Sequence, residues 1–342
     1  MEQRQITWRY KSKKGICHEL GWQNGRQYPW ILPRNQWEQN LWPAIRSGKS
    51  NSLPQYIAKT GIQPHPGKHN LKSSWVLCAN LYFPFRATAE GMALLAGFLR
   101  EHVSPEIEAV DELHLEFAEE GELHPANLLG EPGGQRGSGQ TSPDLAFHVN
   151  GRRGLILIEN KLTEHSFYPC SARRRTGSDE RPGNPFPKRC EDIESILANH
   201  QAQCHQCHPK WHRKYWDILR PVVNEQAMGA LNCCPAAYAG YQLFRQQALA
   251  EGIAQSGKYD FVWSCVALDA RNEALLTCLA KTGIADLESG WAALFRGKAR
   301  FKVFTHQQWV SWVKAHGDPA AWGPWLDYVS ERYGLLESIS AT

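Results

Sequence analysis

The sequence predicts an α/β fold with a small mixed β-sheet flanked by helices. Apolar residues recur at helical spacing over residues 89–102 and 236–251. Residues 155–161 and 259–268 are instead short apolar runs, as in buried strands. Because helical and strand segments follow one another along the chain, we expect both to pack around one core.

The first core elements precede the middle of the chain. Residues 75–85 form a buried apolar segment, and Thr88 can cap a helix over residues 89–102. Apolar residues at 113, 115 and 117 alternate with polar ones, which predicts a strand. Residues 130–140 contain five glycines but lack the GK[ST] ending of a phosphate-binding loop, so we expect a flexible loop there.

Two strands are predicted next, at Asp144–Val149 and Leu155–Lys161, joined by the turn sequence NGRRG. Residues 165–210 are polar, basic and rich in turn-forming residues, which predicts an insertion. A helix over 236–251 and a strand over 259–268 complete the core.

The two ends of the chain are predicted to cover this core. Residues 1–75 are rich in Trp, Pro, Asn and Gly, and are expected to be irregular, with a short helix near Trp37–Ser47. Residues 285–342 carry tryptophans at partly helical spacing and are expected to form a helical cap. The core with its insertion then spans residues 76–284.

Composition limits the classes of protein that fit. The 342 residues allow one or two domains, and 42% hydrophobic with 21% charged residues excludes wholesale disorder. The net charge of +4 neither requires nor excludes a nucleic-acid partner. Because no secretory signal or membrane-length apolar run is present, a cytoplasmic protein without a membrane partner is expected. In the cytosol the ten cysteines are expected to be core residues or metal ligands rather than disulfides.

The hairpin carries the residues that point to chemistry. Side chains alternate faces along a strand, so Glu159 and Lys161 share the face of Leu155 and Leu157. If Asn150 pairs with Leu155, Asp144 lies opposite Lys161. If the register shifts by two, Asp144 lies opposite the neighbouring residue on the same face. Both registers bring Asp144, Glu159 and Lys161 together.

Two carboxylates beside one ammonium suit phosphodiester hydrolysis. Carboxylate oxygens bind Mg²⁺, which polarises a phosphoryl oxygen and makes bound water more acidic. The lysine stays cationic between opposite charges, where it can stabilise charge in the transition state or orient the attacking water.

The stretch resembles the PD-(D/E)xK nuclease superfamily, which has the restriction-endonuclease-like fold. The matching residues are Pro143-Asp144 and Glu159-Asn160-Lys161 at the end of an apolar strand. The resemblance implies that Asp144 and Glu159 hold Mg²⁺ or Mn²⁺ and that Lys161 assists hydrolysis. It also implies a catalytic glutamine on the following helix, for which Gln242 is the candidate. A further acid could be Glu90 or Glu116, and the sequence leaves that choice open.

The insertion contains a group of four cysteines. Their spacing is C-x19-C-x13-C-x2-C, and the final CxxC has metal-ligand spacing. They could bind a structural Zn²⁺ or an iron–sulfur cluster, or they could be free thiols in a loop. The four residues are Cys170, Cys190, Cys204 and Cys207.

The insertion is also basic. Its positive residues are interleaved with aromatic ones, a combination that suits a phosphate backbone with exposed bases. Because it directly follows the catalytic strand, we expect DNA contact there. The residues concerned are Arg173, Arg174, Arg175, Lys210, Arg213 and Lys214.

The sequence therefore predicts a Mg²⁺-dependent deoxyribonuclease, with a restriction-type endonuclease as the first choice. A repair or recombination nuclease acting on branched or single-stranded DNA is the alternative within the class. The alternative outside the class is a DNA-binding or zinc-binding protein without catalysis. A homodimer is an expectation from the resemblance alone.

Overall fold

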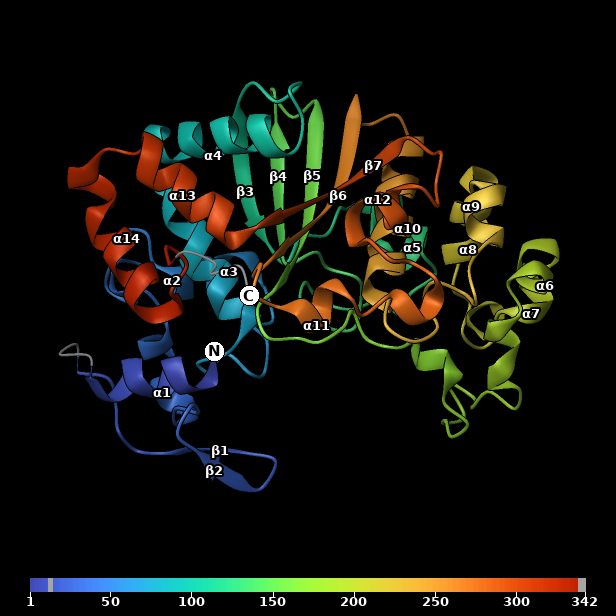
Figure 1. Ribbon diagram of the computed structural model, residues 1–342, viewed down its shortest axis with the longest axis horizontal. Helices are drawn as coiled ribbons and strands as arrows, with labels where there is room; N and C mark the ends of the chain where they lie inside the picture. Colours follow the sequence, from blue (N-terminus) through green and yellow to red (C-terminus); the bar gives the residue numbers. More distant parts are fainter. Residues whose placement is uncertain (12–14, 338–342) are drawn as a thin grey trace.

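A five-stranded mixed sheet forms the centre of the protein (Figure 1). The computed structural model describes residues 1–11 and 15–337. The strand order follows the chain: the first three strands are antiparallel, and the last two are added in parallel. The predicted α/β fold is thereby confirmed. The strands are β3 (Val110–Leu115), β4 (Leu145–Val149), β5 (Gly154–Lys161), β6 (Phe261–Leu268) and β7 (Ala299–Thr305).

The hairpin β4–β5 adopts the second of the two predicted registers. Val149 pairs with Gly154, and Leu145 pairs with Ile158. Gly154 can start the strand because it has no side chain: a Cβ atom there would lie 2.3 Å from the Phe261 ring. Continued by one residue, this register places Asp144 opposite Glu159.

One face of the sheet is covered by helices from both halves of the chain. Figure 1 shows α3 (Ser74–Tyr82), α4 (Ala89–His102) and α13 (His306–His316) on this side, with α14 (Pro319–Tyr333) beyond them. Thr88 caps α4 as predicted, its side chain accepting a hydrogen bond from Gly91. Aromatic rings fill this core and hold the C-terminal helices against α4.

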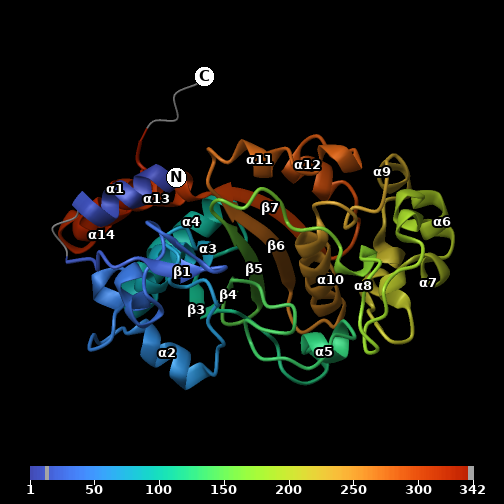
Figure 2. The same ribbon diagram turned by 90° about the horizontal axis from the view of Figure 1, so that it is seen from below.

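The other face packs against α10 (Tyr241–Gln255), which crosses behind β5, β6 and β7. Around it lie α5 (Pro125–Leu128), α8 (Tyr215–Leu219) and α12 (Leu287–Ala292), as Figure 2 shows from below. Leu155 and Leu157 of β5 point into this second core, whereas Ile156 and Ile158 point into the first. The sheet thus separates two apolar layers.

The N-terminal segment is more regular than predicted. It contains α1 (Glu2–Lys11), a hairpin of β1 (Gly21–Gln23) and β2 (Arg26–Tyr28), and α2 (Leu53–Thr60). Where a short helix was predicted near Trp37–Ser47, there are two 3-10 turns, Arg34–Asn40 and Pro43–Ile45. Buried side chains of this segment join the core beneath α14, and the Trp8 ring contacts the Tyr328 ring edge-on.

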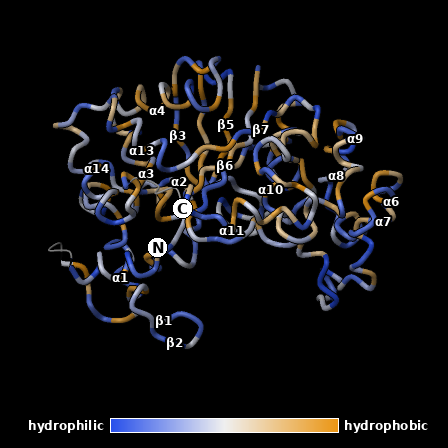
Figure 3. Tube along the Cα trace, viewed as in Figure 1, coloured by the Kyte–Doolittle hydropathy of each residue, from blue (hydrophilic) through white to orange (hydrophobic). Residues whose placement is uncertain are grey.

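The insertion consists of loops and short helices at the far end of the molecule from α14 (Figure 1). It includes α6 (Ile193–Ala198) and α7 (His200–Gln203), and α9 (Glu225–Gly229) follows α8. Figure 3 shows hydrophobic stretches in the central strands and a hydrophilic outer loop on the insertion.

Residues 285–342 were predicted to form a helical cap; the described part contains α12, α13 and α14, but also strand β7, which pairs with β6 over seven residues. The helix α11 (Glu273–Leu276) and the loops around it connect β6 to α12. Alternation in residues 299–305 is weak because β7 is an edge strand with partly exposed side chains, and the tryptophans around it dominate the pattern.

Within the described part of the chain, no helix is both long and apolar enough to cross a membrane.

Candidate active site

The end of β5 places a carboxylate and an ammonium on the α10 face of the sheet. Glu159 and Lys161 are only 7% and 3% exposed. The Lys161 Nζ atom donates to Glu159 Oε1 over 2.7 Å. Residue 160 between them points to the opposite face, where the Asn160 amide donates to the Ser74 carbonyl over 2.8 Å. The predicted alternation along the strand is therefore present.

Asp144 joins this pair from the residue preceding β4. Its Oδ2 atom accepts a hydrogen bond of 2.8 Å from the backbone N–H of Asn160. This bond holds the carboxylate across the gap between the two strands, beside Glu159 and Lys161. The structure thus brings together the three residues that the sequence singled out.

A third carboxylate comes from Glu116, directly after β3. Its backbone N–H donates to the Asp144 carbonyl over 3.0 Å, so the two residues are neighbours across the β3–β4 pair. Glu116 has a φ of 49°, in the left-handed region that costs free energy for a residue with a side chain. Arg136 donates to the Glu116 carbonyl over 2.7 Å, which helps to hold this conformation.

The other candidate for the further acid lies elsewhere. Glu90 is exposed at the start of α4, where its Oε1 atom accepts a 3.0 Å hydrogen bond from the Trp322 indole. It therefore ties α4 to α14, while Glu116 lies with the other acids.

The carboxylates line a cavity of about 530 Å³. Its other walls come from the N-terminal segment, from the start of the insertion and from the first turn of α10. A smaller cavity of about 170 Å³ adjoins the same acids on the side of the glycine-rich loop. Lining residues of the larger cavity include Tyr28, Trp30, His65, Lys72, Tyr168 and Gln242.

Burial and mutual repulsion raise the pKa values of two of the acids. Burial, and then the Glu159 charge, raises the pKa of Asp144 to about 8, although Lys161 and the Asn160 N–H oppose the shift. Burial and the charges of Asp144 and Glu159 raise the pKa of Glu116 well above its usual range. Without a further cation the site therefore retains protons at neutral pH.

Lys161 remains charged in this setting. Burial alone would lower its pKa, but the Glu159, Glu164 and Asp144 carboxylates outweigh it and raise the pKa above the usual value. Burial would likewise raise the pKa of Glu164, but Lys161 and a hydrogen bond from Ser74 lower it. One ammonium thus faces several carboxylates, which leaves an excess of negative charge.

The donor set fits a divalent cation. Asp144, Glu159 and Glu116 offer carboxylate oxygens, the ligands that Mg²⁺ and Mn²⁺ prefer. Gln242 lines both cavities, and among the described residues its buried Oε1 atom has no hydrogen-bond partner. An unsatisfied buried oxygen beside repelling carboxylates is expected where a hydrated cation binds.

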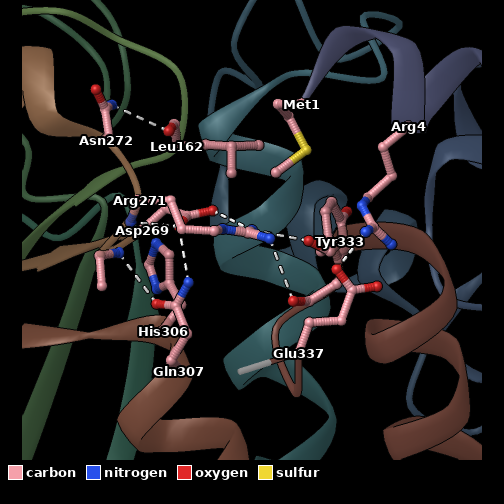
Figure 4. Close-up of polar contacts among 12 residues, drawn as sticks. Met1, Arg4, Leu162, Asp269, Arg271, Asn272, His306, Gln307, Tyr333 and Glu337 are labelled. Carbon is pink, nitrogen blue, oxygen red and sulfur yellow. Dashed lines mark hydrogen bonds and ion pairs between the residues drawn. The ribbon is translucent and has the colours of Figure 1, made fainter. Parts of the chain in front are cut away.

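A polar network fixes the strand end that carries Lys161. His306, the first residue of α13, has its Nε2 atom 2.9 Å from the Lys161 carbonyl oxygen. Figure 4 shows the neighbouring contacts, in which Gln307 donates to Asp269 over 2.7 Å and Arg271 pairs with the same carboxylate. Because Asp269 directly follows β6, these contacts join the ends of β5, β6 and β7.

The predicted DNA-binding residues separate into two groups. Arg173 pairs with Glu191 over 3.1 Å and donates to the Ala237 carbonyl, and Arg213 is buried and donates to the Trp211 carbonyl over 2.6 Å. Through these contacts the charged groups of Arg173 and Arg213 also stabilise the insertion itself, and their role in DNA binding stays a prediction. The exposed members of the set are Arg174, Arg175, Lys210 and Lys214.

The cysteines of the insertion lie in the second core, and a fifth joins them. Cys170, Cys190, Cys204 and Cys234 are buried, and the Cys234 N–H donates to the Cys190 carbonyl over 2.8 Å. Burial, and then Cys170 and Cys204, raises the pKa of Cys190 to about 12. Cys207 is less buried and hydrogen-bonds to Cys204.

Two residues near the acids were missed by sequence reasoning. Glu164 faces Lys161 from the loop after β5, and Arg245 follows Gln242 by one helical turn. The i, i+3 spacing of Gln242 and Arg245 on a helix is a signal that could have revealed the second. Nothing in the local pattern around Glu164 indicates that its carboxylate lies near Lys161.

The mixed sheet and the acidic site at the end of β5 define a restriction-endonuclease-like protein. The chain belongs to the family described as restriction endonuclease associating with ARP, whose model matches residues 4–334. No match was found among curated proteins or solved structures. The family indicates a nuclease.

The acid cluster predicts a pH-dependent stability in the absence of metal. Asp144 keeps its proton up to about pH 8 in the folded state but loses it near 3.8 when unfolded. The folded state therefore binds more protons between these values, and its stability falls as the pH rises through them. We expect the melting temperature in EDTA to drop less between pH 5 and pH 8 for Asp144→Asn than for the wild type.

The exposed Asp327→Asn on α14 is the matched control and should follow the wild type. An identical drop in Asp144→Asn and wild type would contradict the raised pKa of Asp144.

Proposed function

We propose that this protein is a metal-dependent endonuclease of the restriction type that hydrolyses DNA phosphodiester bonds. The observation that carries the proposal is the convergence of Asp144, Glu159, Glu116 and Lys161 in one cavity. Membership of a restriction-endonuclease family supports it. A buried salt bridge alone would not need two further acids whose repulsion destabilises the fold.

Mg²⁺ or Mn²⁺ is proposed to be held by Asp144 and Glu159, with Glu116 as the additional acid. A bound Mg²⁺ supplies a Lewis acid for a phosphoryl oxygen and lowers the pKa of water. The three carboxylates reach this place from the ends of three neighbouring strands, so the sheet itself fixes their separation.

Lys161 is proposed to act as a cation. The Glu159, Glu164 and Asp144 carboxylates raise its pKa, which favours the charged ammonium form. The Glu159 contact of 2.7 Å directs the ammonium toward the acids. There it can donate to a non-bridging phosphate oxygen or to the attacking water, and its positive charge favours the more negative transition state.

Gln242 is proposed to position the water or the phosphate. It is held at the start of α10, where its backbone N–H donates to the Phe167 carbonyl over 2.9 Å. Its free Oε1 atom can accept a proton-bearing group that enters the cavity. As a neutral amide it adds no charge to the acid cluster.

DNA contact is proposed along both walls of the cavity. Tyr28, Trp30 and Lys72 of the N-terminal segment line one wall, and Tyr168 begins the insertion on another. Cations with aromatic rings suit the phosphate backbone and unstacked bases. Of the basic insertion, the exposed Arg174, Arg175, Lys210 and Lys214 remain proposed contacts.

Lys161→Ala should abolish cleavage and leave DNA binding nearly intact. Removing one positioned cation from a buried site lowers rates by roughly 10²–10³-fold or more. The assay incubates supercoiled plasmid with protein and Mg²⁺ or Mn²⁺, and a gel-shift assay measures binding. Asp144→Ala should lose cleavage and also bind Mg²⁺ more weakly.

The exposed Lys314→Ala on α13 controls for the loss of one positive charge and should cleave normally. Full activity in Asp144→Ala would exclude the proposed site. Discrete fragments favour restriction, whereas cleavage confined to branched or single-stranded DNA favours repair. Tight binding without cleavage of any substrate would favour a DNA-binding protein that has lost catalysis.

The buried cysteines are proposed to hold an iron–sulfur cluster. Cys170, Cys190, Cys204 and Cys234 are all buried. Burial raises the pKa of Cys234, and the neighbouring Cys190, Cys204 and Cys170 raise it further, as expected of thiols that lie near one another. Four thiolates are the usual ligand set of such a cluster. Cys234 here replaces Cys207 of the predicted set.

Cys190→Ser and Cys234→Ser should each lose bound iron and acid-labile sulfide from protein purified without oxygen. Their melting temperatures should fall as well, because bound metal stabilises the folded state. Cys265→Ser, which removes a buried thiol from β6, should keep the iron. Wild-type protein containing zinc alone, or no metal, would contradict the cluster.

A further inference from the structure

A second group of ligand-type side chains lies at the opposite end of the β3–β4 pair. Glu112 and His148 face each other across the two strands, and His114 follows two residues along β3 on the same face. The His114 Nε2 atom is 2.9 Å from Glu112 Oε2 and 3.2 Å from His148 Nδ1. His148 Nδ1 is 3.6 Å from the same Glu112 oxygen. Three donor atoms therefore form a compact triangle.

The distances between these three atoms match those between ligands of one transition-metal ion. Metal–nitrogen and metal–oxygen bonds of about 2.1 Å separate neighbouring ligands by roughly 3.0 Å at right angles and 3.4 Å in a tetrahedron. The three observed separations span these values. Two imidazoles and one carboxylate also match the ligand types that bind Zn²⁺, whereas Mg²⁺ prefers oxygen ligands alone.

The contacts of His148 make its Nδ1 atom an acceptor, which His114 Nε2 approaches to 3.2 Å. The Tyr259 hydroxyl donates to the Glu119 carboxylate, which can only accept. The Tyr259 oxygen then accepts from His148 Nε2 over 3.0 Å. With its proton on Nε2, the ring presents Nδ1 as an acceptor. Such outer partners typically orient metal-binding histidines.

Burial disfavours protonation of both imidazoles. Burial, and then the neighbouring His148, lowers the pKa of His114 to about 4. Burial, and then Arg152, lowers the pKa of His148. The Arg152 guanidinium contacts Glu112 Oε2 at 2.9 Å, but its side chain is 60% exposed and can rotate into solvent.

The site opens into its own cavity of about 340 Å³. Arg136, Arg152 and Lys258 line this cavity together with Phe117. His114 and His148 line this cavity, so a metal held by them and by Glu112 would keep a fourth coordination position open toward it. Glu119 and Glu120 also line the cavity, so charges of both signs surround this open position.

We propose that Glu112, His114 and His148 form a Zn²⁺ site distinct from the acidic site. His148 lies four residues from Asp144 on β4, about 13 Å along the strand. The metal would cross-link β3 and β4 near the hairpin turn. It would thereby stabilise the sheet edge that also carries Glu116 and Asp144. This inference does not depend on nuclease activity.

The test measures binding of Zn²⁺ by calorimetry to protein previously dialysed against EDTA. His114→Gln and His148→Gln should each lower the affinity for one equivalent of Zn²⁺ at least tenfold. His18→Gln, which replaces an exposed histidine, should leave that affinity unchanged. Tyr259→Phe leaves all three ligands in place and should weaken binding of the same equivalent, because the orientation of His148 is lost. Zn²⁺ should raise the melting temperature of the wild type.

Co²⁺ separates this site from the cysteines. Nitrogen and oxygen ligands give a visible band without the near-ultraviolet charge-transfer band of thiolates, and this visible band should disappear in His148→Gln. The melting temperature of each metal-free variant shows whether it is folded. If the glutamine variants are unfolded, the Zn²⁺ affinity of Tyr259→Phe tests the site instead. Unchanged Zn²⁺ affinity in the folded variants, or a Co²⁺ spectrum with thiolate bands only, would overturn the proposal.

Discussion

The repulsion among buried carboxylates at the end of β5 is the constraint on which the rest of the site depends. Asp144, Glu159 and Glu116 share one cavity, in which the Lys161 ammonium pairs with Glu159. Such an arrangement costs folding free energy unless protons or a cation offset the charge. The fold maintains it through backbone contacts, chiefly the hydrogen bond from the Asn160 N–H to Asp144 and that from the Glu116 N–H to the Asp144 carbonyl. A cation site is the physical explanation for retaining a cluster of this kind.

The surrounding structure supports that cluster from two sides. The register of the β4–β5 hairpin sets the position of Asp144 against Glu159, and the contact of His306 with the Lys161 carbonyl holds the end of β5. On the α10 side, the first helical turn supplies Gln242 to the same cavity. The N-terminal segment closes the cavity from outside, although it is far from these strands in sequence. Residues distant along the chain therefore build one site.

Much of the core could be predicted because its signals are local. The alternation of Leu155 to Lys161 identified both the strand and the face of its charged residues, and Thr88 marked the start of α4 correctly. The register could be narrowed to two choices, but selecting between them required the close contact of Gly154 with Phe261, which is tertiary. Strand β7 was missed because an edge strand alternates weakly. The sequence also could not show that the Arg213 guanidinium is buried against backbone carbonyls. Cys234 lies near the cysteines of the insertion, and Glu112 lies near His114 and His148, only because of long-range packing that the sequence does not show.

The most direct test of the acid cluster is the proton release that accompanies Mg²⁺ binding. Calorimetric titrations at pH 7 in two buffers of different ionisation enthalpy give the number of protons released. Because the pKa of Asp144 is raised to about 8, the metal-free site holds a proton at this pH that a bound cation must displace. Net proton release by the wild type, reduced in Asp144→Asn, is the predicted result. Mg²⁺ binding without proton release, or no Mg²⁺ binding at all, would contradict the account.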